Sequence, residues 1–216
     1  MYLPRHFEET RPEALHALMR THPLATLVIL SASGDIDANH IPLFFSEETG
    51  GLGSLRGHVA RANPLWRDLL EGAKALAIFH GPDGYISPSW YPTKREHGRV
   101  VPTWNYAVVH AHGSLRAIDD PAWLRTQVEA LTTQQEATFA APWEVGDAPA
   151  DFIDRRLEAI VGIELVIDKL TGKFKNSQNQ PEQNRAGVVA GLENQGNDRA
   201  LALAALVEEA SSSREV

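Results

Sequence analysis

Apolar residues occur along this chain in short runs separated by turn residues, a pattern typical of antiparallel strands. Residues 24–30 form an unbroken apolar run, Ser-Ala-Ser-Gly-Asp follows, and the apolar pattern resumes at 36–45. This arrangement predicts a hairpin with a glycine-containing turn. The same kind of pattern predicts four more strands, at 55–59, 74–79, 103–115 and 161–167.

Helix-start signals lie between some of these strands. Thr10 precedes Glu13 by three residues, which is the spacing of a capping box, and the helix that follows is expected to end before Pro23. A short helix is expected to begin at Asn63-Pro64 and to carry an apolar stripe as far as Gly72. Further helices are expected from Pro121 to about Leu131, around 152–157, and from Pro181 and Asn197 onward.

Strands that come mostly in hairpins, with helices inserted between some of them, favour an α+β fold that is mainly antiparallel β. We expect a barrel with peripheral and C-terminal helices, built as a single domain over 1–216 with 181–216 as a C-terminal helical extension. The first strand is not followed by G-x-G-x-x-G, and the sequence has no P-loop signature. A dinucleotide-binding parallel sheet is therefore disfavoured.

Composition and charge narrow the class of protein. The sequence has no cysteine, which excludes a disulfide framework, thiolate zinc sites and a cysteine nucleophile. The N-terminus lacks the basic-then-apolar order of a signal peptide, and no apolar run approaches the length of a membrane span, so we expect a cytoplasmic protein. A formal net charge of -8 argues against a wide basic face, which makes direct DNA binding doubtful.

The common hydrolase motifs are missing as well. The sequence contains neither a G-x-S-x-G elbow nor an H-E-x-x-H pair. Intrinsic nucleophilic catalysis is therefore disfavoured, and the balance leans toward a protein that is not an enzyme.

Polar residues gather where one strand is expected to meet a helix. His58, Arg61 and Asn63 lie in this junction, and the amides of a helix N-terminus favour anions. Arg61 is suited to bind a phosphate through both arms of its guanidinium, with His58 and Asn63 as further donors. The alternative is that Asn63 only caps the helix and Arg61 is solvated.

Asn39 and His40 lie inside a strand that otherwise has the composition of a buried one. The period of two places them on opposite faces, so at least one polar group points inward. A histidine hydrogen-bonded in the core, or one on the surface, is the alternative to a binding role for His40. Pro42 indicates an edge strand or a bulge.

Aromatic residues braced by prolines form two clusters. Trp90 and Tyr91 lie in 85–94, a rigid segment suited to stack on a flat ring, although a lid or a dimer contact is the alternative. In 103–106, alternation places Thr103 and Asn105 on one face and Trp104 on the other. One face is then able to hydrogen-bond a heteroaromatic edge, with core packing as the alternative.

Two further groups of polar residues are weaker candidates. Lys175 belongs to a polar run after an expected turn at Thr171-Gly172, where its ammonium can reach a phosphate or a neighbouring subunit, or lie in a solvated loop. His110 and His112 share one face, but the sequence offers no third ligand beside them, so no metal site is expected.

Several of these segments together resemble the PaiB family of FMN-binding-type negative transcriptional regulators. The Ile-Ser-Pro-Ser-Trp-Tyr and Pro-Thr-Trp-Asn-Tyr motifs are the most specific, and the resemblance spans nearly the whole chain. Asn176 is a departure, because a more apolar residue is expected there. The matching stretches are 1–7, 38–42, 57–64, 85–91, 101–106 and 173–179.

The resemblance implies an FMN-binding split β-barrel of the flavin-reductase and pyridoxamine-oxidase type, usually a homodimer with ligand sites at the subunit interface. FMN is the implied cofactor, with His58 and Arg61 as candidates for its phosphate and 103–105 for the edge of its ring. The implied function is negative regulation of transcription, acting indirectly because no helix-turn-helix signature is found. The alternatives are a flavin-dependent oxidoreductase and a haem-binding or haem-degrading split-barrel enzyme, with His40, His58, His110 or His112 as the axial ligand.

Overall fold

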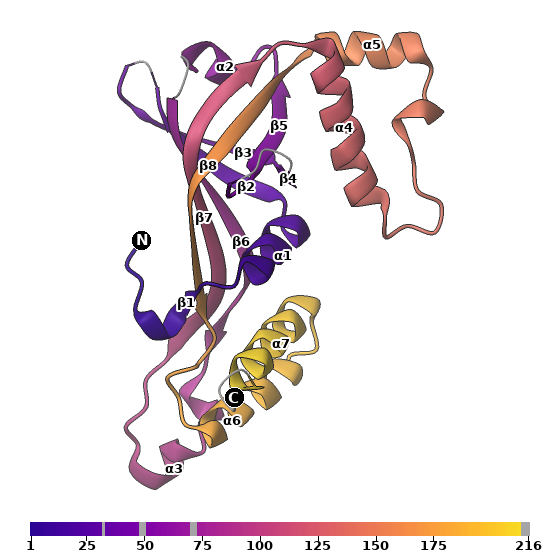
Figure 1. The fold of residues 1–216 in the computed structure, drawn as a ribbon. Coiled ribbons are helices and arrows are strands. Elements are labelled where there is room, and N and C mark those ends of the chain that lie inside the picture. The colour runs from indigo at the N-terminus through magenta and orange to yellow at the C-terminus, as the bar shows by residue number, and fades with distance from the viewer. Residues whose placement is uncertain (32, 48–50, 70–72, 213–216) are drawn as a thin grey trace. The chain divides into compact units, whose positions relative to one another are not determined.

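The computed structural model describes residues 1–31, 33–47, 51–69 and 73–212. Strands carry most of the chain, and helices are inserted between them or follow them (Figure 1). The strands are β1 (Glu8–Glu9), β2 (Leu24–Leu30), β3 (Ile36–Pro42), β4 (Phe44–Ser46), β5 (Ser54–Ala60), β6 (Ala73–Ile86), β7 (Thr103–Ile118) and β8 (Ile160–Lys175).

The helices lie mostly where their start signals predict them. Among the described residues, no helix is long and apolar enough to cross a membrane. The α-helices are α1 (Pro12–Thr21), α2 (Leu65–Asp68), α3 (Thr93–His97), α4 (Pro121–Glu136), α5 (Ala150–Glu158), α6 (Glu182–Glu193) and α7 (Asp198–Ser212), and the 3-10 turns are η1 (Arg5–Phe7), η2 (Pro88–Trp90) and η3 (Val145–Asp147).

All eight strands belong to one sheet, in the order β3-β2-β6-β7-β8-β5-β4, with β1 paired to β8. The pairings β2 with β3, β2 with β6, β4 with β5, and β5 with β8 are all antiparallel. The predicted α+β fold, mainly antiparallel with peripheral and C-terminal helices, is confirmed. In the described part of the chain the strand order is an open path rather than a closed barrel.

Contacts divide the chain into two compact units, which are described separately. Unit 1 comprises Met1–Leu18, His80–Val109 and Thr171–Val216, and unit 2 comprises Met19–Phe79 and His110–Leu170. The long strands β6, β7 and β8 contribute residues to both units. Each unit is therefore assembled from segments that are distant in the sequence.

The core of unit 2 follows from strand alternation. Leu27 in β2, Leu55 in β5 and Leu165 in β8 are buried, and Leu55 pairs directly with Leu165. Beside these strands (Figure 1), the helices α4 and α5 and the turn η3 together bury a smaller apolar cluster: Leu124, Val145, Ile153 and Leu157. Asp120 begins α4 as predicted, because its carboxylate accepts a hydrogen bond from the Trp123 amide at 2.7 Å.

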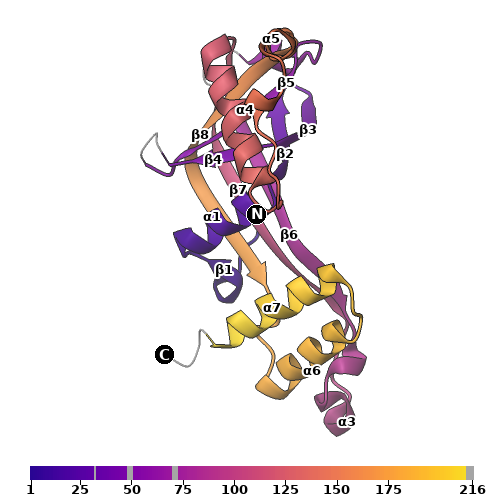
Figure 2. The same cartoon turned by 90° about the vertical axis from the view of Figure 1, so that its right-hand side faces the viewer.

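The core of unit 1 is formed by the C-terminal helices. α6 and α7 lie side by side (Figure 2), and their apolar faces pack on residues of β6 and of the segment after it. The buried residues of this cluster are Ile86, Tyr91, Val188, Leu192, Ala200, Leu203, Ala204 and Val207. The C-terminal helices are thus an integral part of unit 1.

Two long strands extend beyond their predicted ends, because three glycines serve close packing instead of turns. The prediction ended β6 at Phe79, yet the strand continues through Gly81 and Gly84 to Ile86. A Cβ on Gly81 would lie 3.3 Å from the Cβ of Ala107, and one on Gly84 would lie 2.9 Å from the Leu203 side chain. The absence of a side chain is what allows these approaches.

The turn predicted at Thr171-Gly172 is wrong for the same reason. β8 runs on to Lys175, and Gly172 pairs with Glu9 of β1. A Cβ on Gly172 would come within 2.3 Å of the Leu15 side chain, so the glycine lets α1 approach the strand. Lys175 therefore lies at the end of a strand and not in a solvated loop.

Two smaller expectations are corrected. The strand expected over 36–45 is interrupted at Leu43, whose amide donates to the Pro23 carbonyl at 2.9 Å, and β3 with Pro42 lies at the edge of the sheet. The helix after Asn63 is shorter than expected and ends at Asp68. The end of that expectation, over 70–72, lies outside the described residues.

Candidate functional site

In unit 2 the polar junction after β5 brings two predicted residues together. The Asn63 side-chain oxygen accepts from the Leu65 amide at 2.9 Å, and its amide nitrogen donates to the Asn39 side-chain oxygen at 3.0 Å. Asn39 is half-buried, whereas His40, one residue on, is exposed on the edge strand. Asn63 thus accepts a hydrogen bond from the first residue of α2, whose N-cap position is held by Pro64, and it also fixes the amide of Asn39.

Arg61 in the same junction is held by four hydrogen bonds. Its guanidinium forks onto Asp119 at 2.7 and 2.6 Å and also donates to the backbone oxygens of Glu158 at 2.7 Å and Ile160 at 3.0 Å. The hydrogen bond from Arg61 is the main reason that the pKa of Asp119 is lowered. A phosphate at Arg61 would have to replace Asp119, so the phosphate role of Arg61 stays a prediction.

His58 is half-buried beside α4. Its Nδ1 lies 2.9 Å from the side-chain oxygen of Gln127, which is within hydrogen-bond distance. Gln127 is buried, and its amide nitrogen has no hydrogen-bond partner among the described residues. His58 is therefore oriented by a buried amide that keeps one donor unused.

In unit 1 two lysines at the end of β8 lie among aromatic rings and polar groups. Lys175 donates to the Thr103 hydroxyl and to the Trp104 carbonyl, and its ammonium lies 5.9 Å from the centre of the Phe7 ring. Burial lowers the pKa of Lys175, and the neighbouring charge of Lys173 lowers it further. The structure thus joins Lys175 to Thr103 and Trp104, all three predicted as site residues.

Lys173, which sequence reasoning did not single out, is the second cation of this group. It is buried, donates to the Tyr2 carbonyl at 3.1 Å, and lies over the rings of Tyr2 and Tyr106 at 5.7 and 5.4 Å. A buried ammonium needs such partners, because desolvation of a charge is costly. Its spacing of two residues from Lys175 on one strand was the signal available in the sequence.

Asn105, two residues after Thr103 on β7, presents an unused acceptor in unit 1. It is buried, its amide nitrogen donates to the Ser177 hydroxyl at 2.8 Å, and its side-chain oxygen has no partner in the described part of the chain. Ser177 has a φ of 63°, a left-handed conformation that non-glycine residues rarely adopt. Strained residues held by their surroundings are concentrated at binding sites.

The aromatic segment contributes to a cleft of about 320 Å³ in unit 1. The Tyr85 and Trp104 rings meet edge to face with centroids 6.2 Å apart, and Trp90 supplies a third aromatic wall. Asp83 and Arg199 form an ion pair among the other lining residues. Ligand pockets start at about 300 Å³, so this cleft is large enough for a ring system.

Trp90 and Tyr91 are placed differently although they are adjacent. Trp90 lines the cleft and is backed by α6, where a Cβ on Gly191 would lie 2.3 Å from the indole. Tyr91 is buried with Leu192 and Leu203 in the core of unit 1, and burial raises the pKa of its hydroxyl. The predicted aromatic wall therefore consists of Trp90, Trp104 and Tyr85.

The histidine pair on β7 has no further ligand beside it. The rings of His110 and His112 have centroids 6.2 Å apart, and the described residues contain no group of three or more His, Cys, Asp or Glu able to hold a metal ion. Burial lowers the pKa of His112, and Lys169 adds to the effect.

Comparison with known proteins agrees with this fold. Residues 1–169 match the family model described as "Putative FMN-binding domain". A protein of Emericella nidulans is 36% identical and the protease synthase and sporulation protein PAI 2 of Bacillus subtilis 30% identical, each alignment covering 97% of both chains. The FAD and heme binding protein of Mycobacterium smegmatis has the same fold, with a TM-score of 0.59 and 22% identity over 86% of this chain and 80% of that one.

These findings define the class of protein, an α+β protein with a flavin-binding split-barrel fold. The chain belongs to the PaiB family of FMN-binding-type proteins, as its motifs indicated. The family model thereby confirms the prediction that FMN is the cofactor.

The side chains in unit 1 fit a flavin. The unused oxygen of Asn105 is an acceptor suited to a ring N–H, and the ammonium groups of Lys173 and Lys175 are suited to a phosphate or a ring carbonyl. The aromatic walls of the cleft offer faces and edges for stacking. The segment Thr103–Asn105 belongs both to the cleft and to the lysine group, because the Trp104 side chain lines the cleft and the Trp104 carbonyl accepts a hydrogen bond from Lys175.

Proposed function

We propose that this protein binds FMN in unit 1 and acts in the cytoplasm as a homodimeric negative regulator of transcription. The observation that carries the proposal is the segment Thr103–Asn105: Trp104 lines the aromatic cleft, Thr103 accepts a hydrogen bond from the half-buried Lys175, and Asn105 has an unused amide oxygen. Membership of a family with an FMN-binding domain supports the choice of ligand.

In this proposal the flavin ring stacks within the cleft against Trp104 and Trp90. Asn105 accepts a hydrogen bond from the ring edge, and Lys175 with Lys173 neutralises the anionic part of the cofactor. When bound, FMN supplies oxidation and reduction by one or two electrons, while the protein provides stacking, charge and exclusion of water.

The homodimer is supported by aromatic side chains of unit 1 that are exposed to solvent in the single chain. Trp104 is 53% and Tyr85 49% exposed. Aromatic residues are enriched in the cores of interfaces, and a two-fold axis lets the same patch serve both protomers. A second protomer laid over this patch would close the cleft and shield the ring from water.

The regulatory role is supported by the likeness to PAI 2 and by the charge of the chain. A formal net charge of -8 disfavours contact with a phosphate backbone, so we infer that repression acts through a partner or through the redox state of the flavin. A gel-shift assay with purified protein tests this point, and sequence-specific binding by the protein alone at physiological salt would overturn it.

Reconstitution tests the cofactor and its site. Protein incubated with FMN and desalted is expected to retain the absorbance bands of a flavin, whereas a Soret band after growth with haem would favour the haem alternative. Trp104→Ala is expected to weaken FMN binding roughly two- to tenfold, because one aromatic contact contributes about 0.5–1.5 kcal/mol. Trp143→Ala is the matched control, since Trp143 is 43% exposed and lies in unit 2.

Equal FMN affinity for both variants and the parent would remove the cleft from the flavin site. Absence of flavin binding by the parent would reject the proposed function as a whole.

A further inference from the structure

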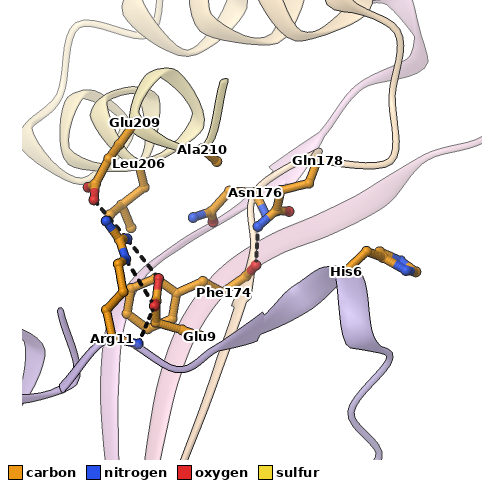
Figure 3. A pocket seen from close by; sticks show the side chains of 9 residues that line it. All are labelled: His6, Glu9, Arg11, Phe174, Asn176, Gln178, Leu206, Glu209 and Ala210. Carbon is orange, nitrogen blue, oxygen red and sulfur yellow. Dashed lines mark hydrogen bonds and ion pairs between the residues drawn. The ribbon is translucent and has the colours of Figure 1, made fainter. Parts of the chain in front are cut away.

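A second cavity in unit 1 lies apart from the residues assigned to the flavin. It is an open pocket with a volume of about 160 Å³, lined by residues of η1, β1, the end of β8 and α7 (Figure 3). The lining residues are His6, Glu9, Arg11, Phe174, Asn176, Gln178, Leu206, Glu209 and Ala210. None of them lines the aromatic cleft.

Asn176 carries the strongest indication that the cavity is a site. It is 2% exposed, and its side-chain oxygen has no hydrogen-bond partner among the residues that the structure describes. Figure 3 shows the Asn176 amide extending toward the α7 wall formed by Leu206 and Ala210. A buried amide oxygen without a donor is costly, and a ligand that supplies an N–H removes that cost.

The rest of the polar lining is dominated by acceptors that are already oriented. Arg11 donates to both carboxylate oxygens of Glu9, at 3.1 and 2.8 Å, and to Glu209 at 2.9 Å. Burial alone would raise the pKa of Glu9, but the hydrogen bonds from Arg11 outweigh it and lower the pKa. Glu9 is therefore ionised at neutral pH, and the carboxylates of Glu9 and Glu209 around the single guanidinium of Arg11 leave a formal charge of about -1 on this part of the lining.

Apolar side chains complete the lining beside these polar groups. Phe174 is buried, Leu206 is half-buried, and Ala210 completes the wall on α7. A ligand of matching chemistry has a donor-rich cationic end and a short apolar body. At a water's share of about 30 Å³, the cavity holds roughly five non-hydrogen atoms.

We propose that this cavity binds a small primary alkylammonium ion, with its N–H groups on Asn176 and the Glu9–Glu209 carboxylates and its alkyl chain on Phe174 and Leu206. None of the residues that line this pocket is assigned to the flavin, although Phe174 and Asn176 are the sequence neighbours of Lys175. Because Glu209, Leu206 and Ala210 belong to α7, a ligand in the cavity would also hold α7 against β1.

Three probes of equal size test the proposal: n-butylammonium, 1-butanol and propanoate. Isothermal titration of the full-length protein is expected to show saturable binding of n-butylammonium alone, with a rise in melting temperature that the other probes do not produce. Lack of saturable heat with n-butylammonium, or equal binding of all three probes, would overturn it.

Leu206→Trp fills the cavity and is expected to weaken n-butylammonium binding at least tenfold. Leu201→Trp is the matched control, because Leu201 lies on the same helix but is 45% exposed and does not line the cavity. If Leu206→Trp does not fold, Asn176→Leu removes the acceptor at similar volume and must abolish binding. Retained n-butylammonium binding in the folded variant refutes the site, whereas FMN affinity is expected to stay at the parent value in both.

Discussion

The indole of Trp90 lies directly against the backbone of Gly191, where a Cβ would come within 2.3 Å of the ring. The 3-10 turn η2 and the helix α6 thereby meet without a glycine side chain between them, and the position of Trp90 as a cleft wall depends on α6. The same helix places Gly187 against the Trp90 carbonyl, where a Cβ would lie 2.0 Å away. The C-terminal helices therefore fix the geometry of the proposed flavin site.

Gly191→Ala is expected to destabilise the protein by about 1–3 kcal/mol, because overpacking forces Trp90 or α6 to shift. Alanine is a better helix former than glycine, so any loss reports the contact and not helix propensity. Denaturant unfolding followed by tryptophan fluorescence measures the effect. Gly146→Ala is the control, since nothing lies within 4 Å of a Cβ there, and equal stability of the two variants would refute the contact.

The buried carboxylate of Glu164 should make the free energy of unfolding depend on pH in the acid range. Burial would raise its pKa, but hydrogen bonds from Arg116 at 3.0 and 2.5 Å and from Arg56 at 3.0 Å outweigh burial and lower it. The folded pKa lies below the unfolded one, so this stability is present above about pH 4.5 and is lost as the pH falls through the folded pKa.

Glu164→Gln is expected to lower the free energy of unfolding by about 2–3 kcal/mol at pH 7. Breaking a buried ion pair usually costs about 3–5 kcal/mol, and the cost is smaller here because Arg116 is 60% exposed. The variant should also lose part of the steepness of acid unfolding below pH 4.5. Urea denaturation at pH 7 and pH 3.5 tests both effects, and an unchanged difference between the two pH values would contradict the assignment.

Lys175 should make FMN binding sensitive to alkaline pH. Its pKa is lowered by burial and by Lys173, so its ammonium deprotonates at lower pH than an ordinary lysine. FMN affinity is expected to fall as the pH rises through that lowered pKa, and titrations between pH 7 and pH 10 measure the fall. Without FMN, the lowered pKa of Lys175 affects the stability of the fold in the opposite sense. The unfolded chain binds the proton more tightly than the folded one, so the contribution of Lys175 to stability rises with pH.

Lys175→Met is expected to lower FMN affinity about ten- to a hundredfold at pH 7, which corresponds to about 1.5–3 kcal/mol for a charge-assisted bond. The remaining affinity should no longer vary between pH 7 and pH 10. Lys169→Met is the control, because Lys169 is exposed on the same strand but in unit 2.

Substitution of Arg61 distinguishes a residue that stabilises the fold from one that binds a phosphate. Because its guanidinium holds Asp119 and two backbone oxygens, Arg61→Ala is expected to lower the melting temperature, and Asp119→Ala should lower it in the same direction. Thermal unfolding of the two single variants and the double variant measures the coupling. A normal melting temperature for Arg61→Ala together with lost FMN binding would instead establish the predicted phosphate role.

Local patterns were sufficient to predict most of the elements. The apolar run that forms β2, the start of α4 at Asp120-Pro121 and the order of the hairpins follow from periodicity and capping chemistry. Gly81 and Gly172 misled the prediction, because a glycine that opens a turn and a glycine that admits a neighbouring side chain are identical in a single sequence. Only the packing of Ala107 and Leu15 distinguishes them.

The site was predictable in part for a similar reason. Thr103, Trp104 and Lys175 were identified from their chemistry, and the structure joins them. Lys173 and Arg199 were missed, since their roles come from partners that are distant along the chain. Charge and aromatic content are visible locally, but proximity across more than a hundred residues is not.

The assembly of unit 1 from Met1–Leu18, His80–Val109 and Thr171–Val216 has a consequence for synthesis. Its first and central segments leave the ribosome long before Thr171 is translated, and at about 5–20 residues per second the 46 residues from Thr171 to Val216 take roughly 2–9 s. During that interval Trp90 and Trp104 have no helices behind them. A nascent or prematurely terminated chain that lacks α6 and α7 cannot form the cleft, so cofactor loading would report that translation has run to the last helix.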